Sequence, residues 1–158
     1  LVDTLEEHGF VHYELSNFGK EGYFSKNNSS YWLGKKYLGI GPSAHSYDGE
    51  KRGWNVANNS LYLKSLAEKK LPIEIETLTK TDRYNEYIMT GLRTIWGVSL
   101  DRIENEFGTN YLHYLQQQTA KYLEDHLLFV DDNIIRTTKR GKFLSDGIAS
   151  DLFLLNLE

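Results

Sequence analysis

Residues 17–46, NFGKEGYFSKNNSSYWLGKKYLGIGPSAHS, combine three kinds of residue that can do chemistry. Glycines and small residues, above all residues 41–44, let the backbone come close to a ligand or to another strand. Tyr31 and Trp32 can stack on a flat ligand, although adjacent aromatics more often fill a core or an interface. His45 can act as a ligand or a proton donor, or it can simply bond a backbone carbonyl.

A second pair of polar residues lies just ahead of this segment, in FVHYELSN at residues 10–17. Apolar and polar residues alternate there, which predicts a strand with one apolar and one polar face. His12 and Glu14 share the polar face, so the carboxylate could orient the imidazole. A packed interior would use the same pair structurally, and the sequence leaves both interpretations open.

The chain lacks a complete catalytic or metal-binding constellation of its own. No two histidines have metal-ligand spacing, and Gly39 with Gly41 lacks the rest of a dinucleotide fingerprint. The sequence has no cysteine. That excludes disulfides, thiolate zinc sites and an Fe–S cluster held by this chain alone, and it fits a cytoplasmic protein.

Composition indicates a globular chain that is not generally basic. Of 158 residues, 40% are apolar and 13% aromatic, with a net charge of −4. No apolar run approaches the ~20 residues of a membrane span, so no stable membrane insertion is expected. Residues 82–158 carry twelve acidic and eight basic side chains. A nucleic-acid partner is therefore not expected, and the basic stretch IIRTTKRGK is interpreted as a solvated patch.

Two kinds of structure are expected to position these residues. Residues 2–8 predict a helix ended by Gly9, a strand follows, and residues 37–40 predict a second strand. In parallel α/β folds, function gathers at the carboxyl ends of strands. Residues 48–60 are expected to form a loop, and residues 60–70 a short helix that Pro72 ends.

Helical periodicity dominates from about residue 73. Helices are predicted at 81–97, with Thr81 or Asp82 as cap, then at 99–107, at 110–126 and at 144–155. LLFVDDNIIRTT predicts a hairpin that turns at residues 131–133. Three helices, a hairpin and a helix resemble a winged helix, which leaves a nucleic-acid-binding module as an alternative. Residues 1–72 and 73–158 are the two predicted domains.

The ordered motifs YELSNFGKEG, SKNNSSYW and YLGIGPSAHS resemble the radical SAM family of oxygen-independent coproporphyrinogen III oxidase-like proteins. The HemW-type haem chaperones are the closer branch. The family pattern reads Y-E-[IV]-S-N-[FY]-A-K-P-G, then S-x-H-N-x-x-Y-W, then Y-x-G-[IL]-G-P-[GS]-A-H-S. EYIMTGLRTIWGVSLDRIENEFG and IIRTTKRGKFLSDGIASDLF are similar to the family's C-terminal domain.

The resemblance implies an α/β part followed by a mostly α part. The last βα units of an incomplete, TIM-like radical SAM barrel would be followed by a winged-helix-like domain. The family's C-x-x-x-C-x-x-C motif, which holds a [4Fe–4S] cluster beside S-adenosylmethionine, does not occur here. The chain, which begins without Met, is thus expected to be a C-terminal fragment that is catalytically inert without the missing N-terminal half of the barrel.

The resemblance also assigns candidate residues. Phe18 and Gly19 match positions that border S-adenosylmethionine, with Gly19 in place of the usual Ala. Gly41, Ser43 and Ala44 would flank the cofactor and substrate cavity. The expected ligand is a porphyrinogen or haem, for which the candidate residues are Asn28, Tyr31, Trp32, His45 and His12. Asn27 stands where the family has the histidine proposed to ligate haem, so Tyr31, His12 or His45 would have to replace it.

Overall fold

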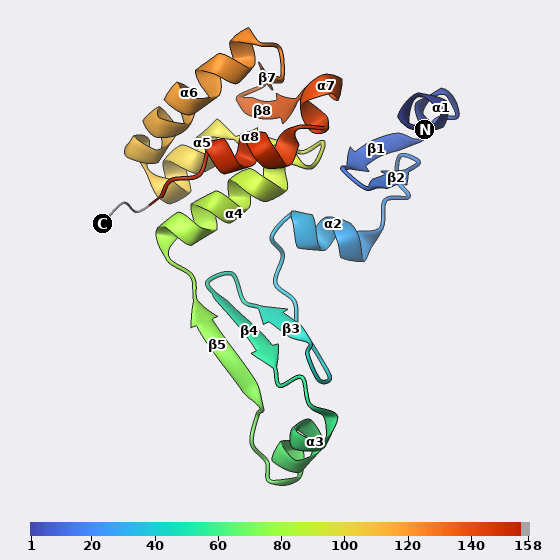
Figure 1. Ribbon diagram of the computed structural model, residues 1–158, viewed down its shortest axis with the longest axis vertical. Coiled ribbons are helices and arrows are strands. Elements are labelled where there is room, and N and C mark those ends of the chain that lie inside the picture. Colours follow the sequence, from blue (N-terminus) through green and yellow to red (C-terminus); the bar gives the residue numbers. More distant parts are fainter. Residues whose placement is uncertain (156–158) are drawn as a thin grey trace. The chain divides into compact units, whose positions relative to one another are not determined.

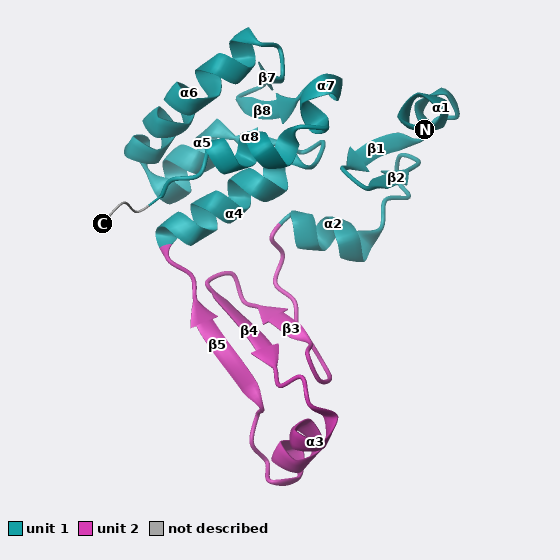
Figure 2. Ribbon diagram, viewed as in Figure 1, with its two compact units in different colours: residues 1–33, 80–158 teal, residues 34–79 magenta. Residues whose placement is uncertain are grey.

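The computed structural model describes residues 1–155, and Figure 1 shows the order of the helices and strands. The chain divides into two compact units, coloured separately in Figure 2. Unit 1 combines Leu1–Leu33 with the chain from Lys80 onward, and unit 2 is Gly34–Thr79. Within the described part, no helix is long and apolar enough to cross a membrane.

The first part of unit 1 is a helix, a hairpin and a second helix: α1 (Val2–Glu7), β1 (Val11–Glu14), β2 (Asn17–Gly19) and α2 (Lys26–Trp32). Gly9, at φ 78°, turns the chain after α1 in the left-handed region that glycine tolerates. Strands β1 and β2 pair antiparallel across a two-residue turn. The Ser25 hydroxyl accepts the backbone N–H of Asn28 and begins α2.

The second part of unit 1 is mostly helical. Its elements are α4 (Lys80–Leu92), β6 (Val98–Ser99), α5 (Leu100–Arg102), the π-helix η1 (Ile103–Phe107), α6 (Thr109–Glu124), β7 (Leu128–Asp131), β8 (Ile134–Thr137), α7 (Lys139–Lys142) and α8 (Ser145–Asp151). The three strands form an antiparallel sheet in the order β6-β8-β7. The predicted Ser99 cap and the predicted hairpin are confirmed.

The core of unit 1 follows from helical spacing. Tyr84, Ile88 and Leu92 lie four residues apart on one face of α4, and all three are fully buried. The Tyr84 hydroxyl donates to the carbonyl of Leu152, 3.2 Å away, and burial raises the pKa of this phenol. The other buried apolar residues of this cluster are Val98, Ile103, Phe107, Leu115, Leu127, Leu128, Ile135, Ile148, Ala149 and Leu152.

Unit 2 is an antiparallel sheet with one helix. Strands β3 (His45–Tyr47), β4 (Lys51–Asn55) and β5 (Ile73–Thr77) pair in the order β3-β4-β5, and α3 (Asn59–Ala67) joins β4 to β5. The prediction of a loop at residues 48–60 is therefore wrong for residues 51–55, which form β4. Its sequence, KRGWN, has few strand-forming residues, and its strand geometry comes from pairing on both edges.

Two further expectations about local structure need correction. The predicted strand at residues 37–40 is reduced to a single bridge between Tyr37 and Tyr47. Helix α4 ends at Leu92 rather than near Gly97. The reason is a bond to β1: the backbone N–H of Ile95 donates to the carbonyl of Tyr13, 3.1 Å away, so the chain leaves the helix to extend beside β1.

The fold is mixed α/β, and its units do not follow the division predicted after residue 72. Residues 1–33 pack with the chain from Lys80 onward, and residues 73–79 belong to unit 2. Every strand pair among residues 1–155 is antiparallel. A parallel neighbour for β1, as a barrel would require, is therefore not present within the described part of this chain.

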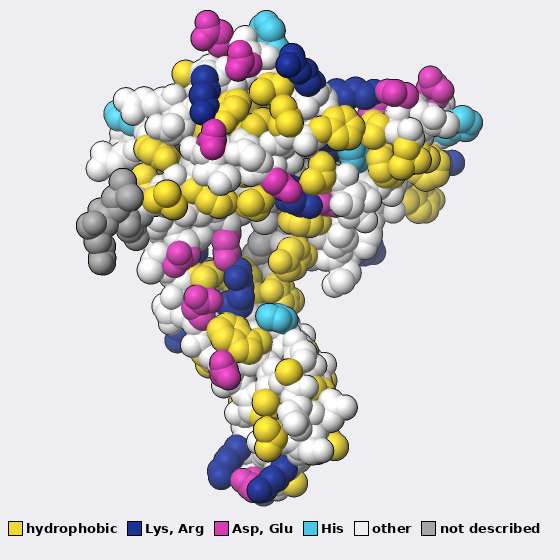
Figure 3. All heavy atoms as spheres, in the orientation of Figure 1, with side chains coloured by type: hydrophobic (Ala, Val, Ile, Leu, Met, Phe, Trp, Pro, Cys, Tyr) yellow, Lys and Arg dark blue, Asp and Glu magenta, His cyan; other side chains and the backbone are white. Residues whose placement is uncertain are grey.

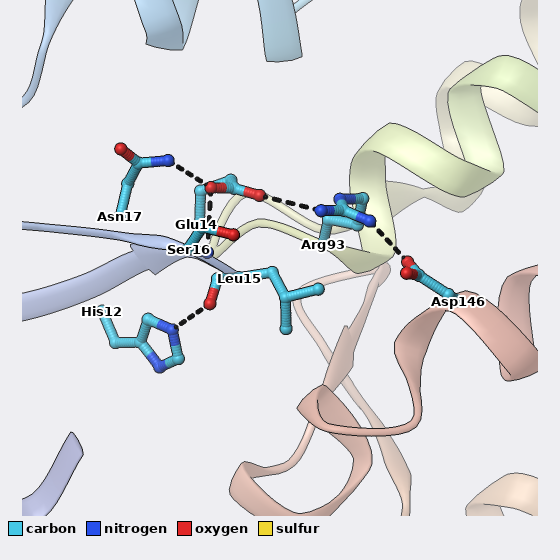
Figure 4. A network of polar contacts seen from close by, with 7 residues as sticks. All are labelled: His12, Glu14, Leu15, Ser16, Asn17, Arg93 and Asp146. Carbon is cyan, nitrogen blue, oxygen red and sulfur yellow. Dashed lines mark hydrogen bonds and ion pairs between the residues drawn. The ribbon is translucent and has the colours of Figure 1, made fainter. Parts of the chain in front are cut away.

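A buried carboxylate connects the two parts of unit 1 (Figure 4). Glu14 is 1% exposed and accepts hydrogen bonds from the Ser16 backbone N–H and the Asn17 side-chain amide. Its second oxygen lies 3.4 Å from the Arg93 guanidinium, which also binds Asp146 at 2.6 Å. Since an unpaired buried carboxylate is costly, Arg93 fixes the position of β1 against α4 and α8.

A close backbone approach fixes the hairpin against α7. Gly141 is buried, and a Cβ built on it would lie 1.8 Å from the carbonyl oxygen of Leu127. The backbone N–H of Thr138 bonds that same carbonyl at 3.0 Å. Only glycine fits at this position. Gly147, on the exposed side of α8, has open space around its Cβ position.

We expect Arg93→Ala to lower the free energy of unfolding by about 2–3 kcal/mol, because Glu14 keeps two donors but loses its charge partner. Urea denaturation of the 158-residue chain measures this. Hydrogen exchange of the Ile95 amide should also accelerate, because its acceptor lies in β1. Arg140→Ala, an exposed arginine on α7, is the matched control and should change stability by less than about 0.5 kcal/mol. Equal effects of the two substitutions would contradict the role of Arg93.

Gly141→Ala should destabilise the chain by about 3 kcal/mol, because the new methyl group overlaps a backbone carbonyl that cannot move alone. Gly147→Ala makes the same chemical change in α8 and should stabilise by about 0.5–1 kcal/mol. Thermal and urea unfolding of the two variants measure the contrast. A Gly141→Ala protein as stable as the parent would show that α7 does not pack on Leu127 in this way.

Candidate functional site

His12 and Phe18, two of the predicted site residues, form one stacked pair. Their ring centroids are 4.2 Å apart at an interplanar angle of 10°. His12 is 8% exposed, and its Nε2 donates to the carbonyl oxygen of Leu15 at 2.9 Å. Figure 4 shows this bond beside the Glu14 network. Glu14 itself bonds Ser16, Asn17 and Arg93, so of the two interpretations that the sequence left open for the His12–Glu14 pair, the contacts favour the structural one.

This arrangement ties the His12 ring to both the turn and the second strand of the β1–β2 hairpin. Both faces of β1 are buried at His12, Tyr13 and Glu14, so the face that carries His12 and Glu14 is packed in the interior. With Nε2 used by a backbone carbonyl, the ring supports the turn and Phe18. Within this geometry, His12 is a positioning residue rather than an open ligand.

Gly19 lies directly under a second aromatic pair. Tyr13 and Phe24 stack at 4.5 Å, and a Cβ on Gly19 would lie 2.9 Å from Cδ1 of Phe24. Glycine therefore lets the hairpin pass beneath the Phe24 ring. The main chain of Gly19 pairs with Val11 of β1. The predicted contact of Phe18 and Gly19 with S-adenosylmethionine stays a prediction.

Helix α2 carries the third group of candidates, Asn28, Tyr31 and Trp32. The rings of Tyr31 and Trp32 meet edge to face at 5.3 Å, and Tyr31 is 55% exposed. The Arg93 guanidinium lies 5.2 Å from the Trp32 ring, which joins α2 to the Glu14 network. Asn27 is exposed in the first turn of the helix.

Several buried polar atoms around α2 have no hydrogen-bond partner in the described part of the chain. They are Asn28 Oδ1, Ser29 Oγ, Trp32 Nε1 and Arg93 Nε. Buried polar groups in proteins are rarely left unbonded, so this face of α2 is suited to a further polar partner. Ser29 and Arg93 were not among the sequence candidates. Ser29 lies within the motif SKNNSSYW, so the sequence could have indicated it. No motif or neighbouring residue indicates Arg93 as a site residue.

The remaining candidates, Gly41, Ser43, Ala44 and His45, belong to unit 2. The backbone N–H groups of this loop are already used. Gly41 donates to the Tyr62 hydroxyl at 3.2 Å, Ser43 to the carbonyl of Val56 and Ala44 to the carbonyl of Gly41. The Asn55 side-chain amide donates to the Gly41 carbonyl at 2.9 Å. Ser43 adopts a positive φ of 60°. The loop is thus shaped by its own unit.

His45 begins β3, pairs with Trp54 and is exposed. The structure brings His12 next to Phe18 and joins α2 to Arg93, but it places residues 41–45 in a different unit from the others. Each group is therefore a local feature of its own unit.

The chain's own residues do not fit an iron–sulfur cluster. The sequence has no cysteine, and residues 1–155 contain no group of three or more His, Cys, Asp or Glu side chains that could hold a metal ion. A haem needs only one or two axial ligands, which Tyr or His can supply. Tyr31 and His45 fit that requirement by residue type and exposure.

Known proteins resemble the chain over nearly all of its length. Residues 78–144 match the family described as the HemN C-terminal domain. The haem chaperone HemW of Lactococcus lactis is 32% identical over 154 residues, which cover 98% of this chain and 40% of that relative. The haem chaperone HemW of Bacillus subtilis is 31% identical, over 94% of this chain and 39% of the relative.

A solved structure shares the fold. It is coproporphyrinogen III oxidase (HemN) from Escherichia coli, described as a radical SAM enzyme, with a TM-score of 0.72 and 18% identity. The match covers 96% of this chain and 39% of that one. The chain spans about two fifths of the length of the curated relatives it matches. The chain belongs to the HemN/HemW-type radical SAM family and corresponds to its C-terminal part.

Proposed function

We propose that this chain is the C-terminal part of a haem chaperone and that it contributes binding surface rather than catalytic groups. One observation carries the choice of chaperone over oxidase. The relatives named as haem chaperones match 98% and 94% of the chain at 32% and 31% identity. The oxidase structure is 18% identical, so it supports the fold alone.

The residues present in this chain determine which roles we assign to it and which to the rest of the longer protein. In the longer protein, a [4Fe–4S] cluster would supply an electron to S-adenosylmethionine, and its thiolate ligands would come from outside this chain. The β1–β2 hairpin would offer Phe18 and Gly19 to the cofactor on a support fixed by Glu14 and Arg93. Asn28 and Trp32 would contribute polar and aromatic contacts to haem or a porphyrinogen. By itself the chain is catalytically inert.

The iron ligand is assigned to Tyr31 or His45. Asparagine is a poor iron ligand, so Asn27 cannot replace the histidine of the resembled motif. The buried ring of His12 has Nε2 bonded to Leu15. Tyr31 is largely exposed and lies edge to face with Trp32, which offers an aromatic surface to a flat macrocycle. His45 is exposed on β3.

The proposal includes two finer points of architecture. We interpret residues 1–47 as the last units of an incomplete barrel. Large apolar side chains are exposed on both units, as Figure 3 shows, which supports a missing partner. We interpret the part from Lys80 onward as winged-helix-like, an interpretation supported by the order α4, β6, α5, α6, β7, β8. The cytoplasmic location stays a prediction.

Titrating haemin into the 158-residue chain should give a saturable Soret shift. Tyr31→Phe or His45→Ala, whichever removes the iron ligand, should weaken binding at least about tenfold and change the Soret band. Tyr23→Phe and His113→Ala make the same chemical changes at other exposed positions and should have no effect. The absence of a saturable shift in the parent, or equal effects in all four variants, would contradict the assignment.

The longer protein distinguishes a chaperone from an oxidase. With its cluster reconstituted, it should bind haemin and release it to an acceptor such as apomyoglobin, and it should not consume coproporphyrinogen III. The isolated chain, treated identically, should cleave no S-adenosylmethionine. Consumption of coproporphyrinogen III at enzymatic rates would overturn the chaperone function and favour the oxidase.

A further inference from the structure

A pocket of about 430 Å³ lies in unit 1, between its N-terminal segment and the β7–β8 hairpin with α7. Its lining includes Glu6, Phe10, His12, Phe129, Lys142 and Phe143. The volume is within the range of pockets that hold small organic ligands. Neither haem-ligand candidate, Tyr31 or His45, lines it, so the pocket is separate from the proposed haem function.

Contacts made by residues that line the pocket hold its two sides together. The Lys139 ammonium bonds Asp3 and also Glu6, the latter at 2.9 Å, which fastens α1 to α7. The Ile95 backbone bonds Tyr13 of β1. The basic stretch IIRTTKRGK is therefore only partly the solvated patch that the sequence suggested, because Lys139 and Lys142 face the N-terminal segment.

Three cationic side chains line the pocket, and they differ in their partners. Arg136 is paired with Asp131 at 2.9 Å, and Lys139 is paired with Asp3 and Glu6. Lys142 is half-buried and donates to the backbone carbonyl of His12. Among residues 1–155, no carboxylate forms an ion pair with Lys142. The half-buried charge of Lys142 is therefore met by a backbone carbonyl and by no ion-pair partner among the described residues, which leaves the pocket with charge complementarity for an anion.

Burial lowers the pKa of Lys142 to about 8, while the more distant charges of Glu14 and Glu6 raise it by less. Desolvation of this ammonium is thus incompletely compensated by the protein. A carboxylate placed beside Nζ would supply the missing compensation.

The rest of the lining is apolar and aromatic. Phe10, Phe129 and Phe143 border the pocket, and Phe143 is 65% exposed while Phe129 is 42% exposed. Exposed phenyl rings around a recess favour a ligand with a flat apolar body. The ammonium and the rings together select a molecule with both an apolar part and a negative charge.

We infer that this pocket binds a small organic carboxylate with a flat apolar body, its carboxylate on the Lys142 ammonium and its body against the rings of Phe129 and Phe143. The observation that carries the inference is a half-buried ammonium in an aromatic pocket, without an ion-pair partner among residues 1–155. The site is distinct from α2 and from residues 41–45.

The test uses 2-naphthoate as the probe and 2-naphthalenemethanol as its uncharged counterpart. Both are titrated into the ¹⁵N-labelled chain, and backbone shifts map the site. Naphthoate should shift the amides of residues 10–12 and 136–143 saturably and bind at least about tenfold more tightly than the alcohol. Equal affinity for the two probes, or naphthoate shifts confined to other regions, would overturn the inference.

Variants separate the contribution of the Lys142 charge from that of the aromatic rings. Lys142→Met should weaken naphthoate binding at least about tenfold and leave the alcohol unchanged, whereas Lys142→Arg should stay within about threefold of the parent. Phe143→Ala, at an exposed position, should weaken both probes about threefold or more. Lys121→Met, a lysine of α6 outside the pocket, is the control and should change neither. Unchanged naphthoate affinity in Phe143→Ala would refute the binding mode even if Lys142→Met fails to fold.

The pH dependence supplies a second measurement on the unmodified chain. Naphthoate stays ionised above pH 7, so its affinity should be constant below pH about 8 and fall as Lys142 loses its proton at higher pH. The pocket lining that contains Lys142 also includes Glu6, His12, Arg136 and Lys139, and the charge of Glu14 acts on Lys142 as well. The pKa of Lys139 is raised by its carboxylate partners, so Lys139 remains charged across this range. An affinity that does not change between pH 7.5 and pH 10 would exclude Lys142 as the anion's partner.

Discussion

The burial of the Glu14 carboxylate is the constraint on which the arrangement of unit 1 depends. A carboxylate that is 1% exposed needs donors and a counter-charge, and Arg93 supplies the counter-charge from 79 residues along the chain. Because Arg93 also lies over Trp32, the same guanidinium serves the hairpin and helix α2. Arg93 therefore links the hairpin and helix α2, which carry the candidate groups of unit 1.

Local sequence signals predicted the elements whose stability is local. Tyr84, Ile88 and Leu92 mark one face of α4, and Ser99 marks a helix start. Asp132 and Asn133 both adopt positive φ, as a tight hairpin turn requires, and such residues tolerate it. These features depend on a few neighbouring residues, so one sequence is enough to predict them.

The elements that the sequence did not predict depend on distant partners. Strand β4 has few residues that favour strand formation. It is a strand because β3 and β5 pair with its two edges. Helix α4 ends before Ile95 and Trp96 because the backbone N–H of Ile95 bonds a carbonyl of β1 instead. In the candidate site, the motif residues were visible in the sequence, but the stacking of His12 on Phe18 and the unbonded atoms around α2 were not. The stacking depends on the bond between His12 and the Leu15 carbonyl, and helix α2 contacts Arg93, whose only mark in the sequence is its charge.

The insertion of unit 2 between the two parts of unit 1 has a consequence for how the chain acquires its structure. During synthesis Glu14 emerges before unit 2, and Arg93 follows only after all of unit 2 has been made. Until then Glu14 has no counter-charge, and Asp3 and Glu6 wait still longer for Lys139, which lies more than 130 residues away. Contacts of such long sequence separation slow folding. The strands of unit 2 pair only with one another, so we expect unit 2 to complete its contacts before unit 1, which surrounds it in the sequence.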